Sequence, residues 1–206
     1  MPLQNDRLEL ILASRSAARI ALLEGAGLTF RTLPADLDED ALRREMTQTE
    51  PDDVAMQLAQ AKARHVSAAN PDALVIGADQ VLSFDGEILA KPADRQAAAL
   101  QLARLGTNTH SLHSACVCAM SGNILWRCVD SAHLTMRPLS PQFIACYLDS
   151  AGDQVLASVG AYQLEGLGAH LFAAIAGDYF TILGLPLLPL LAFMRQHGVI
   201  ADMGAC

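Results

Sequence analysis

Positive charge is scarce in this sequence, which holds 14 Lys and Arg against 22 Asp and Glu in 206 residues, a formal net charge of -8. Proteins that bind nucleic acid without regard to sequence take most of their affinity from Lys and Arg that neutralise phosphates. The charge balance argues against that class, and no nucleic-acid partner is predicted. A small polyphosphate is compatible with it, because a few cations, backbone N–H groups and a divalent metal can converge on one anion.

Paired cysteine motifs are also missing. The cysteines are odd in number, and no two have the C-x-x-C spacing of a redox or metal motif. Reduced thiols in a reducing compartment are the simplest interpretation, and zinc ligation is not expected because no His/Cys cluster has the usual ligand spacing. The five cysteines are Cys116, Cys118, Cys128, Cys146 and Cys206.

Apolar runs long enough to cross a bilayer are absent from the sequence. The amino-terminal segment carries acids at Asp6 and Glu9 and has no long apolar stretch, so it does not resemble a signal peptide. The most apolar late segment, 183–194, is too short to span and contains Pro186 and Pro189. A soluble, cytoplasmic protein with no membrane partner is predicted.

Repeats, low-complexity tracts and Ser/Gly/Pro-rich linkers are absent as well, which predicts a single domain over residues 1–206. Hydrophobic residues make up 52% of the chain, enough to form a buried core. Segments typical of strands and helices alternate, which predicts an α/β fold with a mixed sheet. The expected strands are 8–13, 73–78, 81–84, 87–90, 111–120, 124–136 and 169–176, and the expected helices are 17–24, 51–69, 93–105, 141–150 and 186–197.

The first candidate site is the turn that leaves the first strand and opens the first helix. A strand-to-helix turn presents free backbone N–H groups at the positive end of a helix dipole, where phosphate binds readily. Ser14 and Ser16 add hydroxyls, and Arg19 adds a guanidinium one turn later. The alternative is structural, with Ser16 only as an N-cap and Arg19 solvated.

The second candidate is Asp79, which stands at the end of the apolar segment 73–78. Ligands of α/β sheets bind outside the carboxyl ends of strands, so this carboxylate is placed to hold a metal or orient water. Lys91, followed by Pro92, comes after the expected hairpin and offers a cation to the same place. A solvated acid at a strand end is the competing interpretation.

An acidic run offers a second metal-side carboxylate. Mg²⁺ prefers one or two carboxylates together with phosphate oxygens and water, so one acid of Asp36, Asp38 and Glu39 beside Asp79 would suffice. A solvated loop is the alternative for this run. Lys62 is likewise interpreted as an ordinary exposed helix lysine unless its face meets the cleft.

Other polar residues give weaker signals. His110 and His113 are interpreted as structural, because no Ser or Cys nucleophile motif accompanies them. Glu165 lies in Glu-Gly-Leu-Gly before the expected strand 169–176, where the glycines are typical of a turn.

The order and spacing of these segments resemble one family, the Maf nucleotide pyrophosphatases. That family has the elongated α/β fold of the inosine triphosphate pyrophosphatase-like group, a mixed sheet flanked by helices with two lobes around a cleft. The most specific elements are S-x-S-x-x-R, G-[AS]-D and K-P in this order. The matching segments are 10–16 with Arg19, 61–63, 76–79, 86–87, 91–92, 160–162, 165–168 and 184–187.

The resemblance implies hydrolysis of a nucleoside triphosphate to a nucleoside monophosphate and pyrophosphate, with Mg²⁺ or Mn²⁺ as cofactor. Asp79 matches the catalytic carboxylate, which accepts a proton from water and contacts the metal. Asp36 matches a metal-side acidic position that is often Glu. Ala17 stands where relatives usually have Pro, which loosens the turn without removing a phosphate contact. The implied phosphate-binding residues are Ser14, Ser16, Arg19, Lys62 and Lys91.

Base preference is implied by three positions that separate subgroups of the family. Members similar to the dTTP/UTP group tend to have Arg, Thr and Gln there, and members similar to the 7-methyl-GTP group tend to have Trp, Gln and Glu. This chain has Ala18, Gln80 and Glu165, so two of three positions match the methylguanine group. Ala18 cannot stack on a methylated base as Trp could. A purine or modified purine is expected, with dTTP or UTP as the alternative.

Two other functions fit the same pocket. One is a nucleotide-binding regulator of cell division and septum formation without turnover, and the other is a phosphate-ester hydrolase that releases orthophosphate. Asp79 beside several cations favours the pyrophosphatase. A homodimer is expected by analogy with relatives.

Overall fold

The computed structural model describes residues 4–5, 8–47 and 50–201, so Cys206 lies outside the described residues. The strands are β1 Leu10–Leu12, β2 Arg31–Thr32, β3 Leu74–Phe84, β4 Glu87–Leu89, β5 Thr109–Met120, β6 Asn123–Met136 and β7 Phe172–Ala176. The α-helices are α1 Ala17–Gly25, α2 Glu39–Glu45, α3 Pro51–Ala69, α4 Arg95–Leu105, α5 Pro141–Ala151, α6 Tyr179–Ile182 and α7 Leu187–Gln196. Short 3₁₀ helices are η1 Asp153–Ala157, η2 Val159–Ala161 and η3 Leu167–Leu171.

The sheet is mixed, as predicted. Within the described residues, seven strands pair in the order β2-β1-β3-β5-β6-β7, and β4 pairs with β3. β1 is parallel to both β2 and β3, whereas the β3–β4 and β6–β7 pairs are antiparallel. The predicted α/β class is therefore confirmed.

The chain divides into two compact units. Unit 1 comprises the described residues up to Gln80, Ser114–Asp130 and those from Gly184 onward. Unit 2 comprises Val81–His113 and Ser131–Leu183. The strands β3, β5 and β6 each contribute residues to both units.

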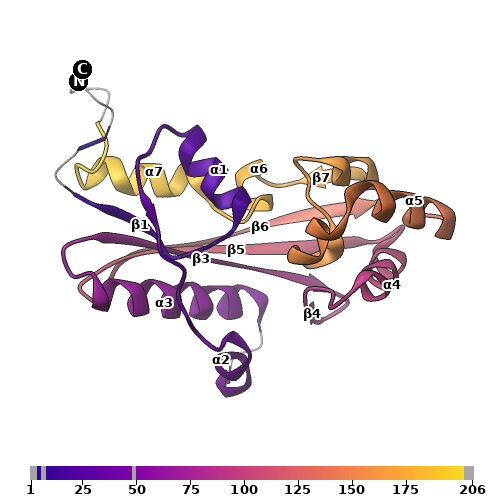
Figure 1. The fold of residues 1–206 in the computed structure, drawn as a ribbon, viewed down its shortest axis with the longest axis horizontal. Coiled ribbons are helices and arrows are strands. Elements are labelled where there is room, and N and C mark those ends of the chain that lie inside the picture. Colours follow the sequence, from indigo (N-terminus) through magenta and orange to yellow (C-terminus); the bar gives the residue numbers. More distant parts are fainter. Residues whose placement is uncertain (1–3, 6–7, 48–49, 202–206) are drawn as a thin grey trace. The chain divides into compact units, whose positions relative to one another are not determined.

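In unit 1, α3 lies along one face of the sheet, and α1 and α7 lie along the other (Figure 1). α3 begins and ends as predicted, because Pro51 suits the first helical turn and Asp52 and Asp53 favour its positive end. Its close approach to β3 depends on Gly77, where a Cβ atom would lie only 2.7 Å from Ala63 N. The sheet and α3 therefore meet backbone to backbone beside Gly77.

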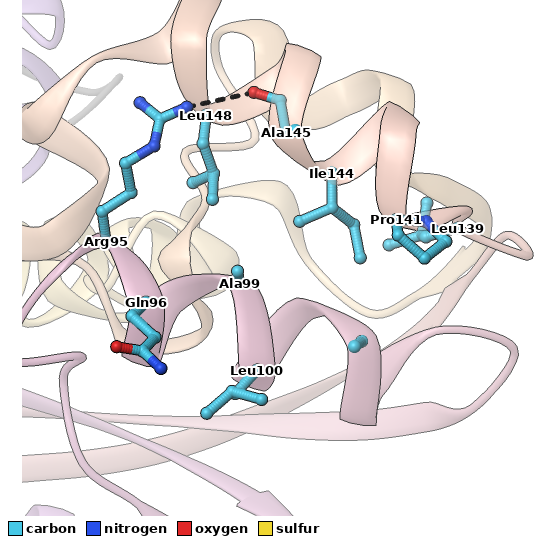
Figure 2. Close-up of a pocket in the computed structure, with 10 residues that line it drawn as sticks. Arg95, Gln96, Ala99, Leu100, Leu139, Pro141, Ile144, Ala145 and Leu148 are labelled. Atoms are coloured by element: carbon cyan, nitrogen blue, oxygen red, sulfur yellow. Dashed lines mark hydrogen bonds between the residues drawn. The ribbon is translucent and has the colours of Figure 1, made fainter.

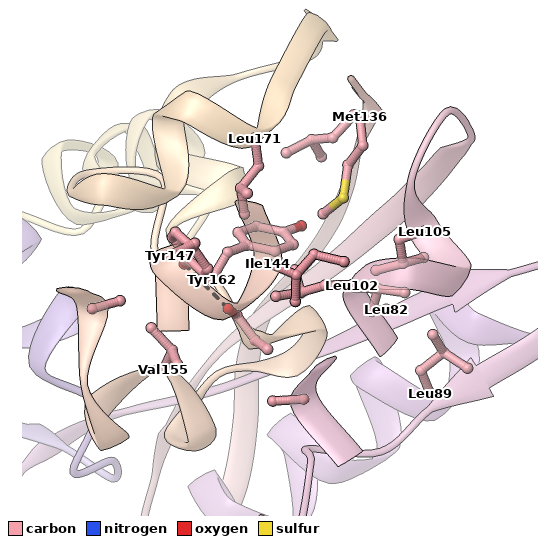
Figure 3. Close-up of a cluster of buried hydrophobic side chains, with 14 of the residues drawn as sticks. Leu82, Leu89, Leu102, Leu105, Met136, Ile144, Tyr147, Val155, Tyr162 and Leu171 are labelled. Carbon is pink, nitrogen blue, oxygen red and sulfur yellow. Dashed lines mark hydrogen bonds between the residues drawn. The ribbon is translucent and has the colours of Figure 1, made fainter. Parts of the chain in front are cut away.

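Unit 2 has its own apolar core, which Figure 3 shows between the strands and the helices α4 and α5. Leu82 and Leu89 come from the β3–β4 hairpin, and Leu102, Ile144 and Leu171 reach the core from helical segments. Burial of this apolar surface stabilises the unit, at about 25 cal/mol per Å² removed from water.

Asp85-Gly86 and Ser121-Gly122-Asn123 are turn sequences that predict hairpins between the expected strands, and both hairpin turns are confirmed. Asp85 and Gly86 have φ of 53° and 76°, and Ser121 and Gly122 have φ of 49° and 78°. Two consecutive left-handed residues are the geometry of a type I′ turn, which matches the twist of the strands it connects. Asn123 is already part of β6.

Two predicted strand boundaries are wrong. The expected strands 73–78 and 81–84 are one continuous strand, β3, so Asp79 lies inside it instead of at its end. The expected strand 169–176 begins only at Phe172, because residues 167–171 form a 3₁₀ helix folded against Gln163. The short elements β2, α2 and α6 were not predicted.

The structure shows the state of four cysteines and the apolar character of the described helices. Each cysteine among the described residues is a free thiol: Cys116, Cys118, Cys128 and Cys146. No described helix combines the length and the apolar character needed to span a membrane.

Candidate functional site

The turn after β1 has the predicted strand–turn–helix form. β1 pairs with β3 up to Leu12 and Ile76, and the Ala13 N–H donates to the Ile76 carbonyl over 2.8 Å. The chain then leaves the sheet, and the side chain of Ser16 caps α1 by accepting from the Arg19 N–H. The Ser14 hydroxyl accepts from the Ser16 N–H over 3.2 Å, so both serines order this turn.

Arg19 is buried, which excludes the interpretation of a solvated helix residue. Its Nε donates to the Gly184 carbonyl over 2.8 Å, and its Nη1 donates to the Ala78 carbonyl over 2.9 Å and to Ser14 Oγ over 3.3 Å. Burial lowers the pKa of Arg19, and the charges of Asp79, Cys116 and Glu39 oppose that shift. A guanidinium keeps its charge in proteins, so Arg19 is a buried cation beside the turn. Its Nη2 atom takes part in none of these three hydrogen bonds.

The prediction that Asp79 stands at a strand end is wrong, because Asp79 lies inside β3. β3 continues through it, and the neighbouring strand β1 is the one that ends, opposite Ile76. Asp79 therefore lies beyond the carboxyl end of β1 on a strand that runs on. Asp79 is only 5% exposed, which excludes a solvated acid.

The two carboxylate oxygens of Asp79 differ. Oδ1 accepts from Lys62 Nζ over 2.6 Å, whereas Oδ2 is buried and has no hydrogen-bond partner among the described residues. A buried carboxylate oxygen without a partner is costly and marks a position where a ligand, water or ion would be stabilised.

Lys62 is a buried residue of α3, not an exposed helix lysine. Its Nζ lies 2.6 Å from Asp79 Oδ1 and 2.9 Å from Glu39 Oε1, so two acids share one ammonium group. The close packing at Gly77 places α3 within reach of Asp79, two residues further along β3. Gly77, the glycine of the G-[AS]-D element, thus allows the backbone packing that brings Lys62 to Asp79.

Glu39 is the member of the acidic run that pairs with Lys62. Asp38 caps α2 by accepting from the Ala41 N–H over 2.9 Å, and Glu39 begins the helix. Asp36 precedes the helix and is exposed. The signal that could have found α2 is its charge pattern, with acids in the first turn and Arg43 and Arg44 in the last.

Gln80 has a defined polar environment in unit 1. Its Nε2 donates to Ser114 Oγ over 2.9 Å, and its Oε1 would be 3.6 Å from a Cβ atom at Gly184. Gly184 has φ of +93°, and the same Cβ would be 3.3 Å from Arg19 Nε. Ser114 and Gly184 were missed as single residues. Ala18, in the first turn of α1, is partly buried.

Lys91 and Glu165 belong to unit 2. Lys91 is exposed directly after β4, beside the buried Pro92, and Glu165 is exposed in the turn between η2 and η3. Gly168 holds that turn close to Gln163, whose backbone N would be 2.9 Å from a Cβ at position 168. The roles predicted for Lys91 and Glu165 stay predictions.

Two histidines and a groove of unit 2 have contacts or lining that include none of the predicted site residues. His110 is buried, and its Nε2 lies 2.7 Å from Tyr162 Oη. His113 Nε2 lies 2.8 Å from Ser83 Oγ. Figure 2 shows a groove of about 570 Å³ between α4 and α5, where Leu100 and Ile144 are among the lining residues and Arg95 donates to the Ala145 carbonyl. None of the predicted site residues lines it.

A divalent metal would find few protein ligands here. Across residues 4–5, 8–47 and 50–201, no group of three or more His, Cys, Asp and Glu side chains is arranged to hold a metal. Asp79 Oδ2 and the carboxylate of Glu39 still fit Mg²⁺ or Mn²⁺, because Mg²⁺ sites typically use one or two carboxylates and complete the shell with phosphate oxygens and water.

These features define a class, an α/β domain in which a strand-to-helix turn of the phosphate-binding type (the phosphate-type turn) lies beside one buried acid, one partly exposed acid and two buried cations. The sequence model of the Maf-like protein family matches residues 9–197, and the chain belongs to the Maf family.

Curated relatives support this assignment over nearly the full chain. A protein of Nitrobacter hamburgensis named nucleoside triphosphate pyrophosphatase is 51% identical over 93% of this chain and 95% of its own. A protein of Brucella suis named 7-methyl-GTP pyrophosphatase is 53% identical over 93% of this chain and 98% of its own. A solved dITP/XTP pyrophosphatase from Mycobacterium abscessus is 16% identical with a TM-score of 0.40, covering 96% of this chain and 100% of that chain, a likeness too low to support an argument.

Proposed function

We propose that this protein hydrolyses nucleoside triphosphates to a nucleoside monophosphate and pyrophosphate. The observation that carries the proposal is the buried Asp79, whose unpartnered Oδ2 lies in the same unit as the phosphate-type turn, Arg19 and Lys62. Relatives named nucleoside triphosphate pyrophosphatase and 7-methyl-GTP pyrophosphatase support the same reaction.

In the proposed reaction, water attacks the α-phosphorus and pyrophosphate leaves. Asp79 Oδ2 accepts the proton of that water, because it is the carboxylate oxygen that no side chain occupies. Ser14, Ser16 and the N-terminus of α1 bind phosphate oxygens, and Arg19 and Lys62 neutralise charge that develops in the transition state. Lys91 is proposed to add a further positive charge.

Asp79 and Glu39 would hold Mg²⁺ or Mn²⁺. A bound divalent metal supplies charge neutralisation at the phosphate oxygens and lowers the pKa of bound water. Asp36 was predicted for this role, and Glu39 now has the stronger support, since Glu39 shares Lys62 with Asp79 while Asp36 is exposed.

The base preference is proposed to favour a purine or modified purine such as 7-methylguanine. Glu165 can accept from the N1–H and N2–H₂ donors of guanine, and Gln80 matches the methylguanine subgroup. The exposure of Glu165 supports a side chain that is free to meet a base. Removal of modified nucleotides from the nucleotide pool is the corresponding proposed role.

The deciding experiment is a panel of normal and modified nucleoside triphosphates, with monophosphate, pyrophosphate and orthophosphate resolved chromatographically. Pyrophosphate with monophosphate is expected. Orthophosphate as the first product would indicate a phosphate-ester hydrolase, and nucleotide binding without product would indicate a regulator of cell division.

A homodimer is also proposed, and strand β7 supports it. β7 ends the sheet order, contains Phe-Ala-Ala-Ile-Ala without a charge, and is exposed from Ala173 to Ala176. Uncharged exposed edge strands pair readily with another strand. Light scattering of the wild type and of Ile175→Lys tests this, since a lysine on the edge should give monomers. A monomeric wild type would remove the proposal.

A further inference from the structure

Lys62 occupies an unusual electrostatic position. Within the described residues, the ion-pair partners of its Nζ are Asp79 Oδ1 at 2.6 Å and Glu39 Oε1 at 2.9 Å. The side chains of Lys62 and Asp79 are 11% and 7% exposed, so this contact is largely screened from water. One ammonium group therefore holds together the buried carboxylate of Asp79 and the carboxylate of Glu39, whose side chain is 42% exposed.

Two carboxylates close enough to share one ammonium would repel each other without it. Like charges in a poorly solvated site interact strongly, and a buried charge without a partner is unfavourable. Asp79 Oδ2 remains unpartnered beside this cluster, so the acids retain binding capacity that Lys62 does not use. The same oxygens are the type that Mg²⁺ and Mn²⁺ bind.

The geometry points to Lys62 as a resident counter-ion that keeps Glu39 and Asp79 assembled until a divalent cation binds. Lys62 then leaves Asp79 Oδ1 and turns outward, where its ammonium is available to phosphate. This inference rests on the proposed function, because it takes the two acids as that enzyme's metal site.

The contrast with Arg19 explains why a lysine suits this task. The Arg19 guanidinium is tied to the Gly184 and Ala78 carbonyls and cannot move without breaking both bonds. Lys62 carries a compact charge on a flexible four-carbon stem. Because its partners are the two acids themselves, a cation that takes over those acids releases the lysine at the same time.

The wild-type protein allows a direct test, since Lys62 and Lys91 are the only lysines in the sequence. The nucleotide-free protein is treated briefly with an amine-acylating reagent, with and without Mn²⁺, and both lysine peptides are quantified by mass spectrometry. Acylation of Lys62 should rise at least about threefold with Mn²⁺, because a released ammonium becomes accessible. Lys91, which is already exposed, is the internal control and should not change.

The outcomes are distinct from those of the proposed function. Unchanged acylation of Lys62 while calorimetry records Mn²⁺ binding would overturn the inference, and so would the absence of Mn²⁺ binding without nucleotide. Pyrophosphate release by the same preparation decides the proposed function separately.

A second test removes the counter-ion. Lys62→Met keeps the stem and removes the charge, so Mn²⁺ should bind at least about tenfold tighter than to the wild type, because no ammonium competes for the acids. Arg64→Met is the matched control, since it removes a positive charge from an exposed position of the same helix. A folded Lys62→Met protein with unchanged or weaker Mn²⁺ affinity would overturn the inference.

Discussion

The two units bury different ionisable side chains. Unit 1 buries Arg19, Lys62 and Asp79 and holds them with an ion pair and backbone carbonyls. Unit 2 buries His110, Tyr147 and Tyr162 in neutral form. Burial lowers the pKa of His110 to about 4, and it raises the pKa of Tyr147 to about 12 and that of Tyr162 still further.

The difference distinguishes the residues of the proposed site from the residues that stabilise the fold. Keeping charges inside a protein costs several kcal/mol per ion unless partners compensate, so buried charges that are retained indicate a functional site. Neutral buried groups can instead be satisfied by single hydrogen bonds, such as the one from Tyr147 Oη to the Ala161 carbonyl over 3.2 Å. This contrast supports the proposal that Asp79, Lys62 and Arg19 of unit 1 carry the chemistry, whereas the buried core of unit 2 stabilises the fold.

The largest expected effect is the loss of activity on metal removal. Excess EDTA should abolish pyrophosphate release, and Mg²⁺ or Mn²⁺ should restore it, because few cationic side chains face a triphosphate. Product formation is followed chromatographically before and after chelation. Full activity in excess EDTA would remove the metal from the proposed mechanism.

Asp79→Asn should lower kcat by at least about a hundredfold, the smaller end of the effect of losing a general base. The amide keeps the size of the side chain but cannot accept the proton. Steady-state kinetics measure the loss, and circular dichroism verifies the fold. Near wild-type turnover in a folded variant would mean that another group is the base.

Gly77→Ala tests whether the approach of α3 to β3 builds the site. A Cβ atom at position 77 would overlap the backbone of α3, so the free energy of unfolding should fall by about 3 kcal/mol. Lys62 should also separate from Asp79, lowering kcat in the folded protein. Urea unfolding gives the stability change. Gly25→Ala is the control, since nothing lies within 4 Å of its Cβ, and it should change stability by less than about 1 kcal/mol.

The pH dependence of stability tests whether His110 is buried in its neutral form in unit 2. Its pKa is about 4 when folded and 6.5 when unfolded, so the unfolded state binds more protons between these values. The contribution of His110 is complete above pH 6.5 and should be lost as the pH falls to about 4, by about 3 kcal/mol in total. Urea unfolding of wild type and His110→Gln at several pH values gives the difference. A difference that does not vary with pH would show that His110 does not titrate this way.

Glu165→Gln has the smallest expected effect and concerns selectivity. An amide can offer a donor or an acceptor, so the preference for guanine-type bases should fall by about tenfold, within the usual range for an unpaired polar group. The measurement is the ratio of kcat/KM for 7-methyl-GTP or GTP to that for dTTP or UTP. If wild type and variant give the same ratio, Glu165 does not read the base.

Local sequence was sufficient for most elements and for the residue types of the site. The helix at 51–69 was predicted to the residue, because its proline and acids act within one turn. Both type I′ hairpins were predicted from Asp85-Gly86 and Ser121-Gly122, whose conformation is a local property. The short helix α2 was missed because none of its residues is buried, so it has no apolar pattern to reveal it.

The sequence by itself determined the α/β class and the strand–turn–helix with Ser14 and Ser16, and it singled out Asp79 as a candidate catalytic residue. Only the tertiary structure decided that Glu39 shares Lys62 with Asp79, and that Arg19 is held by the carbonyls of Ala78 and Gly184. The physical reason is distance along the chain. Periodicity and turn chemistry act over a few residues, whereas the Lys62 ion cluster joins residues from the three separate segments α2, α3 and β3, and Lys62 meets Asp79 only when α3 packs against β3.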